Sequence, residues 1–213
     1  MKSRTLSRLL LSLATTFSLA APLAANASGI VGGWYGTTGV GLGGVFTFLS
    51  NGTYYSASDA DAMWPVDMER GTYNWNAATG ALNMTSIVDM DSPPGPLSPI
   101  NAQVSGNTMT TNTPFGTLTR AVDPNSPIVG SWHVGAPDNS SGVVVTFLSN
   151  GYYFEADDGD HNGSSTSQKG VDIGTYSWDS LTGAFSATKL VDSNGSWGIT
   201  EDMCNKMQVS GNT

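Results

Sequence analysis

The chain carries the same sequence landmarks twice, in the same order. The run "TFLSNG" occurs at Thr47 and again at Thr146. Three further pairs are "IVGGWYG" and "IVGSWHVG" at Ile30 and Ile128, "GTYNWNAATGAL" and "GTYSWDSLTGAF" at Gly71 and Gly174, and "QVSGNT" at Gln103 and Gln208. The offset between copies grows from 98 to 105 residues, so we expect the insertions in loops, which tolerate them better than strands. This order of landmarks indicates a duplicated domain.

Both copies show the alternation of β-strands and no helical periodicity. In "GTYNWN", Tyr73 and Trp75 fall on one face, and the polar residues between them fall on the other. The Asn51-Gly52 pair predicts a hairpin turn, because these residues readily supply the positive φ angles of tight turns. In the first copy we predict strands at 30–36, 44–50, 53–59, 70–76, 81–89, 100–105, 108–113 and 116–122.

Short sequential strands with tight turns predict an all-β fold of two tandem antiparallel up-and-down barrels, with eight strands in the complete copy. Closure into a barrel removes unpaired edges, although a two-sheet sandwich has similar strand spacing and stays open as an alternative. We predict barrels at 28–122 and 128–213, joined by the linker "DPNSP" at 123–127. Bulky rings should face inward and polar groups outward.

The first strand of each copy contains a Gly-x-Trp motif, Gly32-x-Trp34 and Gly130-x-Trp132. The motif resembles the signature of lipocalin-like and avidin-like barrels, as found in small β-barrel repeats of exported bacterial proteins. Arg120 lies where lipocalins carry an arginine in the last strand. The resemblance implies that its guanidinium stacks on Trp34 in a cation–π contact that ties the last strand to the first.

The second copy stops at Thr213, where the first copy continues into "MTTNTPFGTLTRAV". It lacks the last two strands and any counterpart of Arg120. We therefore expect open edges on its first and sixth strands. Either the chain is a fragment, or a strand-exchange partner donates the missing hairpin by strand addition.

Residues 1–27 have the pattern of a signal peptide, with a basic start, an apolar middle and an Ala25-Asn26-Ala27 cleavage site. The mature protein is expected to be secreted or periplasmic. No other segment approaches the roughly 20 apolar residues of a membrane span.

Loss of this segment removes 3 of 8 basic residues and leaves 5 against 17 acidic ones, a net charge of −12. Nucleic acid is therefore not an expected partner, because its binding depends on lysine and arginine. The single cysteine, Cys204, excludes an intrachain disulfide.

An acidic loop follows the third strand of each copy. In the second copy, Asp158-x-Asp160-x-Asn162-Gly163 matches the opening half of a calcium loop, but Lys169 stands where the closing glutamate belongs. This loop is either a weak calcium site of Asp158, Asp160 and Asn162 or a solvated acidic segment. No other cofactor is expected.

The same loop offers the best catalytic set. His161 could act as the base, with Asp158 or Asp160 to orient it and Ser164 as the nucleophile. A secreted hydrolase of ester or polymer substrates is thus the alternative function. The chain has no Gly-x-Ser-x-Gly motif, and neither histidine has a counterpart in the first copy.

Aromatic residues recur at matching positions in the two copies. The candidates for ligand binding are Trp34, Tyr54, Tyr73, Trp75, Trp132, Tyr153, Tyr176 and Trp178. They either fill the barrels or hold a ligand at an open end, where hydroxyl and indole groups would orient it. Duplication without a duplicated catalytic set favours a secreted non-catalytic module that binds a small apolar ligand, a carbohydrate or a protein.

Overall fold

The computed structural model describes residues 17–18, 29–60, 65–93, 95–135, 142–159, 168–195, 198–200 and 205–210. Within these ranges all regular secondary structure is β-strand, which confirms the predicted all-β class. This part of the chain contains no helix long and apolar enough to cross a lipid bilayer. Apart from residues 17–18, the predicted signal peptide lies outside the described residues.

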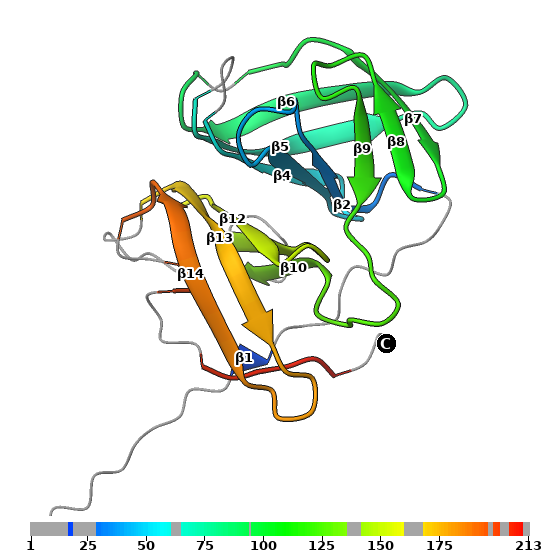
Figure 1. Cartoon of the computed structure of the whole chain (residues 1–213). Helices are drawn as coiled ribbons and strands as arrows, with labels where there is room; N and C mark the ends of the chain where they lie inside the picture. The colour runs from blue at the N-terminus through cyan, green and yellow to red at the C-terminus, as the bar shows by residue number, and fades with distance from the viewer. Residues whose placement is uncertain are drawn as a thin grey trace, which may run out of the picture.

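The first repeat forms a closed eight-stranded antiparallel barrel (Figure 1). Its strands are β2 (Gly32–Gly36), β3 (Gly44–Phe48), β4 (Thr53–Ser58), β5 (Asp67–Trp75), β6 (Ala81–Asp89), β7 (Ile100–Ser105), β8 (Thr108–Thr111) and β9 (Thr117–Arg120). The last strand returns to the first through the pairs Trp34–Arg120 and Tyr35–Thr119. The predicted barrel is confirmed for this repeat, and the sandwich is excluded.

The second repeat forms an open five-stranded antiparallel sheet. Its strands are β10 (Gly130–Gly135), β11 (Gly142–Phe147), β12 (Tyr152–Asp157), β13 (Gly170–Trp178) and β14 (Phe185–Asp192). The isolated bridge Ala184–Lys206 is equivalent to the pair Ala81–Asn101, which joins β6 to β7, the sixth strand of the first repeat. Beyond it, the short strand β15 (Met207–Gln208) pairs in parallel with β1 (Phe17–Ser18). The open sheet agrees with the predicted incomplete second barrel.

The floor of the barrel has the arrangement that the Gly-x-Trp motif implied. Trp34 is fully buried and donates a hydrogen bond from Nε1 to the carbonyl of Ile30 at 2.7 Å. The guanidinium carbon of Arg120 lies 4.0 Å from the Trp34 ring centre, so the predicted cation–π contact is confirmed. Arg120 also donates to the carbonyls of Val31 and Gly29, both at 2.6 Å. One side chain therefore joins the last strand to the chain entering the first.

The repeated "GTY" motif marks a β-bulge in each copy, between Arg70 and Gly71 and between Ile173 and Gly174. A Cβ atom on Gly71 would lie 2.0 Å from the Thr85 carbonyl oxygen and 2.6 Å from the Tyr54 ring. Gly174 is equally crowded, with a carbonyl oxygen 2.1 Å away. Only glycine lets the neighbouring strand and the tyrosine ring approach this closely.

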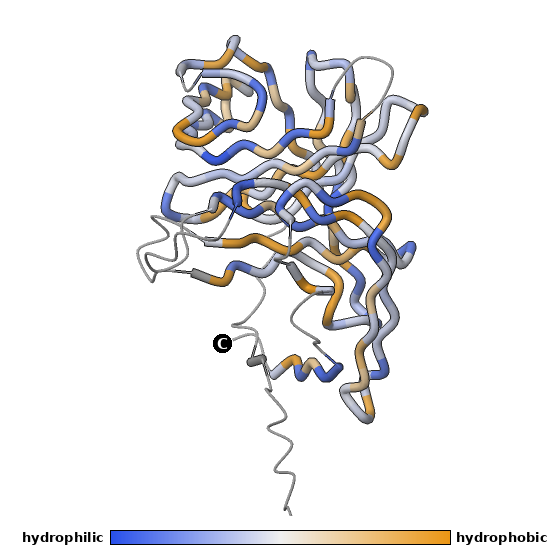
Figure 2. Tube along the Cα trace, turned by 90° about the vertical axis from the view of Figure 1, so that its left-hand side faces the viewer, coloured by the Kyte–Doolittle hydropathy of each residue, from blue (hydrophilic) through white to orange (hydrophobic). Residues whose placement is uncertain are grey.

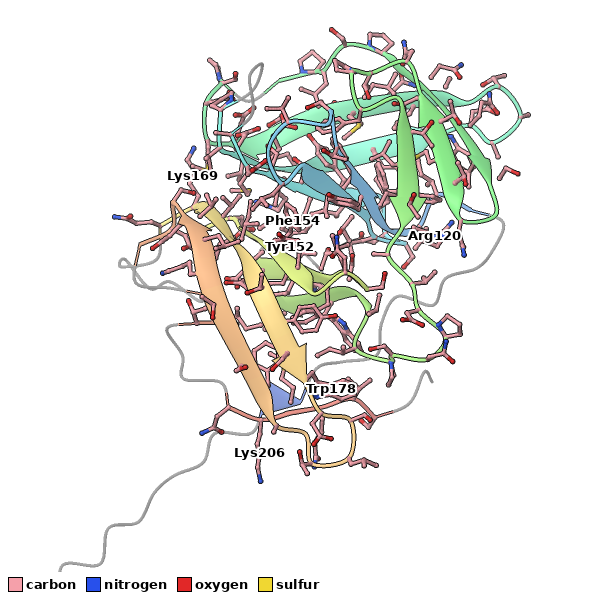
Figure 3. All side chains as sticks on the ribbon, viewed as in Figure 1. Arg120, Tyr152, Phe154, Lys169, Trp178 and Lys206 are labelled. Carbon is pink, nitrogen blue, oxygen red and sulfur yellow. The ribbon has the colours of Figure 1, made fainter. Side chains whose placement is uncertain are left out.

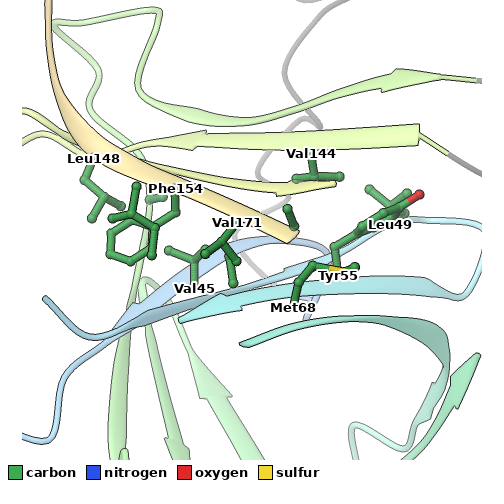
Figure 4. Close-up of a cluster of buried hydrophobic side chains, with 12 residues drawn as sticks. Val45, Leu49, Tyr55, Met68, Val144, Leu148, Phe154 and Val171 are labelled. Atoms are coloured by element: carbon green, nitrogen blue, oxygen red, sulfur yellow. The ribbon is translucent and has the colours of Figure 1, made fainter. Parts of the chain in front are cut away.

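The two repeats pack against each other through a shared hydrophobic core (Figure 4). Its buried residues are Val45, Leu49, Tyr55, Ala57, Met68 and Ala121 from the first repeat, and Val144, Leu148, Phe154, Ala156, Val171 and Ile173 from the second. Hydrophobic and polar residues are interleaved along the strands (Figure 2), but on β3 and β4 both faces carry buried apolar side chains. The expectation that outward-facing groups are polar is therefore wrong for these strands.

This interface has an approximate two-fold axis, because equivalent strands face each other: β2 with β10, β3 with β11, β4 with β12 and β5 with β13. At its centre the equivalent residues Thr47 and Thr146 bring their Oγ1 atoms within 3.2 Å, and the Ser131 hydroxyl contacts both. Gly33 is the counterpart of Ser131, and a Cβ atom there would lie 2.1 Å from Ser131 Oγ. The sequences "GGW" and "GSW" thus differ because only one serine fits near the axis.

Candidate functional site

A cavity of about 490 Å³ lies at the end of the first barrel. We call this end the barrel mouth; it is bounded by residues 91–93, 95–97 and 113–115. One side is apolar and is formed by Phe46, Met84, Leu97, Ile100 and Phe115. The Phe46 and Phe115 rings meet edge to face, with their centres 5.8 Å apart. The polar part of the lining includes Ser56, Ser58 and four acidic residues, Asp67, Glu69, Asp89 and Asp91, which we call the acidic wall.

Strand register brings the acidic wall together. Along β5, Asp67 and Glu69 alternate with outward residues and share the inward face of Tyr73. Glu69 pairs directly with Asp89 on β6, and Asp91 follows two residues later. One carboxylate oxygen from each of Asp67, Asp89 and Asp91 lies within 4.8 Å of the others.

Burial and mutual repulsion perturb these carboxyl groups. Burial, a hydrogen bond with Asp89 and the neighbouring negative charges raise the pKa of Glu69 to about 8. Burial and the charges of Asp91 and Asp89 raise the pKa of Asp67 to about 6. Burial opposes ionisation of Asp89, but hydrogen bonds from the backbone N–H groups of Ser92 and Asp91, at 2.8 and 3.0 Å, and from Glu69 keep its pKa below the ordinary value.

The raised pKa of Glu69 predicts a stability that falls with pH. Glu69 keeps its proton in the folded state at pH values where it would lose it in the unfolded chain, whose ordinary pKa is 4.5. The stabilising contribution of Glu69 is therefore fully present below pH 4.5 and is lost as the pH rises through about 8. In metal-free protein we expect the free energy of unfolding to fall by about 2 to 4 kcal/mol between pH 5 and pH 8. Glu69→Gln should remove most of this slope in urea denaturation with EDTA. Equal slopes for the two proteins would contradict the assignment.

The equivalent region of the second repeat is filled by its own chain. Asp172, the counterpart of Glu69, accepts hydrogen bonds from Tyr153 Oη at 3.0 Å and from Thr200 Oγ1 at 3.3 Å. Glu155, the counterpart of Ser56, accepts one from the backbone N–H of Ile199 at 3.0 Å. Residues 198–200 therefore cover in the second repeat the surface that faces a cavity in the first.

The eight aromatic candidates belong to the packing of the repeats, and none lines the cavity at the barrel mouth. Seven of them donate a hydrogen bond from the ring nitrogen or hydroxyl: Trp34, Tyr73, Trp75, Trp132, Tyr176 and Trp178 to backbone carbonyls, and Tyr153 to Asp172. Tyr54 is fully buried, with its hydroxyl beside the Ser86 side chain.

Asp158 has a structural role in the described part of the molecule. It accepts a hydrogen bond from the Gly142 N–H at 2.9 Å, and it forms a buried ion pair with Arg70 of the other repeat, also at 2.9 Å. Its counterpart Asp59 likewise accepts hydrogen bonds from the backbone of Leu42 and Gly43. This aspartate anchors the loop before the second strand in both copies.

The other members of the catalytic and calcium sets, Asp160, His161, Asn162 and Ser164, lie outside the described residues. Both sets therefore remain predictions. His133, the other histidine, lies at the interface, with its ring centre 5.8 Å from that of Tyr55.

The sequence reasoning missed Asp67, Asp89 and Asp91 as site residues. A signal for Asp67 was present, because the alternation Asp67-x-Glu69-x-Gly71-x-Tyr73 places both acids on the face of an inward tyrosine.

No protein-family model, curated protein or solved structure matches the chain.

Proposed function

We propose that the chain is a non-catalytic binding module whose first barrel takes a small ligand with an apolar body into its mouth. The observation that carries this proposal is the difference between the repeats. A cavity lies at the barrel mouth, whereas residues 198–200 occupy the equivalent region of the second repeat. The second repeat then serves to support the barrel through the shared core. The resemblance to lipocalin-like barrels favours the same function.

The cavity has the size and chemistry of a small-molecule site. Its volume of about 490 Å³ lies within the range of roughly 300 to 1,000 Å³ that is usual for ligand pockets. The apolar side would bury the body of the ligand, while the hydroxyls of Ser56 and Ser58 and the acidic wall would orient a polar end. Carboxylates repel anions, so the ligand is expected to be neutral or positively charged.

A neutral dye that fluoresces in apolar surroundings, N-phenyl-1-naphthylamine, tests this proposal. We expect saturable binding to the full chain. Phe115→Ala should weaken it about tenfold, because the lost contact area contributes about 1.5 kcal/mol. The control Leu190→Ala, at a position 54% exposed on β14, should bind like the wild type. Absence of saturable binding, or equal affinity in Phe115→Ala, would overturn the proposal.

A further inference from the structure

The second repeat contacts the barrel at the point where the chain leaves β6 and starts across the barrel mouth. This point, which we call the corner, consists of Asp89 at the end of β6 and Met90 after it. Lys169 lies at the side of the second repeat that faces the barrel (Figure 3), and its ammonium donates a hydrogen bond to the backbone carbonyl of Asp89. The Ser193 hydroxyl contacts the Met90 sulfur at 3.8 Å. Two segments of the second repeat therefore meet at one corner of the barrel.

The corner sets the start of the segment that bounds the mouth, residues 91–93 and 95–97, which we call the rim. The Asp89 carboxylate accepts hydrogen bonds from the N–H groups of Asp91 and Ser92 at 3.0 and 2.8 Å. At the other end of the rim, the Leu97 N–H donates to the Met84 carbonyl of β6 at 3.0 Å. The rim lines the cavity between these two attachments. Its position over the mouth therefore depends on the corner.

The contacts from the second repeat are backed by its own strands. Ser193 Oγ accepts a hydrogen bond from the Val171 N–H of β13 at 2.9 Å, and the Ser193 N–H donates to the Val171 carbonyl at 2.9 Å. A Cβ atom on Gly170, the residue after Lys169, would lie 2.7 Å from the Asn194 backbone nitrogen. The segments that carry Lys169 and Ser193 thus pack directly against each other. They meet the corner as one unit supported by β13.

The approximate two-fold axis of the interface does not repeat the hydrogen bond from Lys169. Asp67 and Gly170 occupy equivalent positions in the two repeats, so the counterpart of Lys169 is Val66. The Val66 side chain carries no hydrogen-bond donor and packs against the shared core. The lysine therefore acts only toward the repeat whose mouth contains the cavity.

We propose that Lys169 is a positioning residue for the ligand site of the first barrel, an inference that rests on the proposed function. By holding the Asp89 carbonyl, its ammonium fixes the corner and hence the part of the lining that the rim supplies. A hydrogen bond from a charged donor is stronger than one between neutral groups, so a single lysine can hold this corner. A lining that is ordered before the ligand arrives binds more tightly than one that must be ordered by it. The second repeat thus takes part in binding as well as in support.

Dye titration of Lys169 variants of the full chain tests this role. Lys169→Met should weaken the binding of N-phenyl-1-naphthylamine about threefold to tenfold, because the ligand must then order the rim. Lys169→Arg keeps a charged donor and should bind within about twofold of the wild type. The matched control is Lys206→Met, the same change at an exposed lysine at the far end of the second repeat (Figure 3), and its affinity should be unchanged. The dye is neutral, so the lost charge does not act on it directly.

Hydrogen exchange of the ligand-free protein gives a second readout that does not use the dye. The amides of Asp91, Ser92 and Leu97 should exchange about threefold faster or more in Lys169→Met, because the rim opens more often, while the midpoint of urea denaturation stays the same. Exchange at the floor of the barrel, as at Trp34, should not change.

The outcomes separate this inference from the proposed function. Saturable binding by the wild type with equal affinity in Lys169→Met would overturn the role of Lys169 and leave the proposed function standing. A loss of affinity that Lys169→Arg does not restore would also overturn it. If the wild type does not bind the dye, the proposed function fails, and unchanged exchange at the rim in Lys169→Met would show separately that Lys169 does not order it.

Discussion

Trp34→Ala should lower the free energy of unfolding of the first barrel by about 3 to 5 kcal/mol, the usual cost of truncating a large buried aromatic residue. Trp34 is 0% exposed, fills the barrel floor and carries the Arg120 guanidinium on its ring. The substitution would leave a cavity and also remove the surface on which Arg120 packs. Urea denaturation followed by far-ultraviolet circular dichroism measures the effect.

The control for this experiment is Leu181→Ala, at a residue that is 95% exposed in the turn after β13. It should change the free energy of unfolding by less than about 0.5 kcal/mol, as is usual for surface substitutions. A loss below about 1 kcal/mol in Trp34→Ala would contradict a packed floor that closes the barrel.

Phe154→Asp should disrupt the shared core and cost about 3 to 5 kcal/mol, because it places a charge without a partner in an apolar interior. Phe154 is 1% exposed, and its ring contacts Tyr35 of the first repeat with centres 5.9 Å apart. We expect reduced stability and faster proteolysis between the repeats, at residues 121–129, which lie outside the strands. Urea denaturation and limited proteolysis give the two measurements.

The same substitution on an exposed strand position, Leu190→Asp on β14, is the matched control and should have little effect on either measurement. If Phe154→Asp were as stable and as protease-resistant as this control, the repeats would not depend on a common core.

The barrel could be predicted strand by strand because its signals are local. The Asn-Gly turn and the inward alternation of Tyr73 and Trp75 set the register without reference to distant residues. The shared core was missed, although β3 and β4 carry apolar residues on both faces, as in Val45 beside Phe46. Such a pattern indicates burial on both sides of a strand.

The candidate site depends on contacts that a local pattern does not contain. The sequence could have placed Glu69 inside the barrel by alternation, but its meeting with Asp89 depends on the register of two strands across a bulge. In the second repeat, Ile199 and Thr200 hydrogen-bond with Glu155 and Asp172, which are far from them in the sequence. These relations follow from tertiary packing rather than from any short motif.

A titration with N-phenyl-1-naphthylamine followed by ¹H–¹⁵N nuclear magnetic resonance tests most directly whether the first repeat alone carries the binding site. We expect the dye to shift backbone amides that line the barrel mouth, such as those of Ser56, Leu97 and Phe115. Amides at the far end of the second repeat, residues 176–187, should stay unchanged. Shifts confined to the second repeat, or none in either repeat at saturating concentrations, would contradict a binding site in the first repeat.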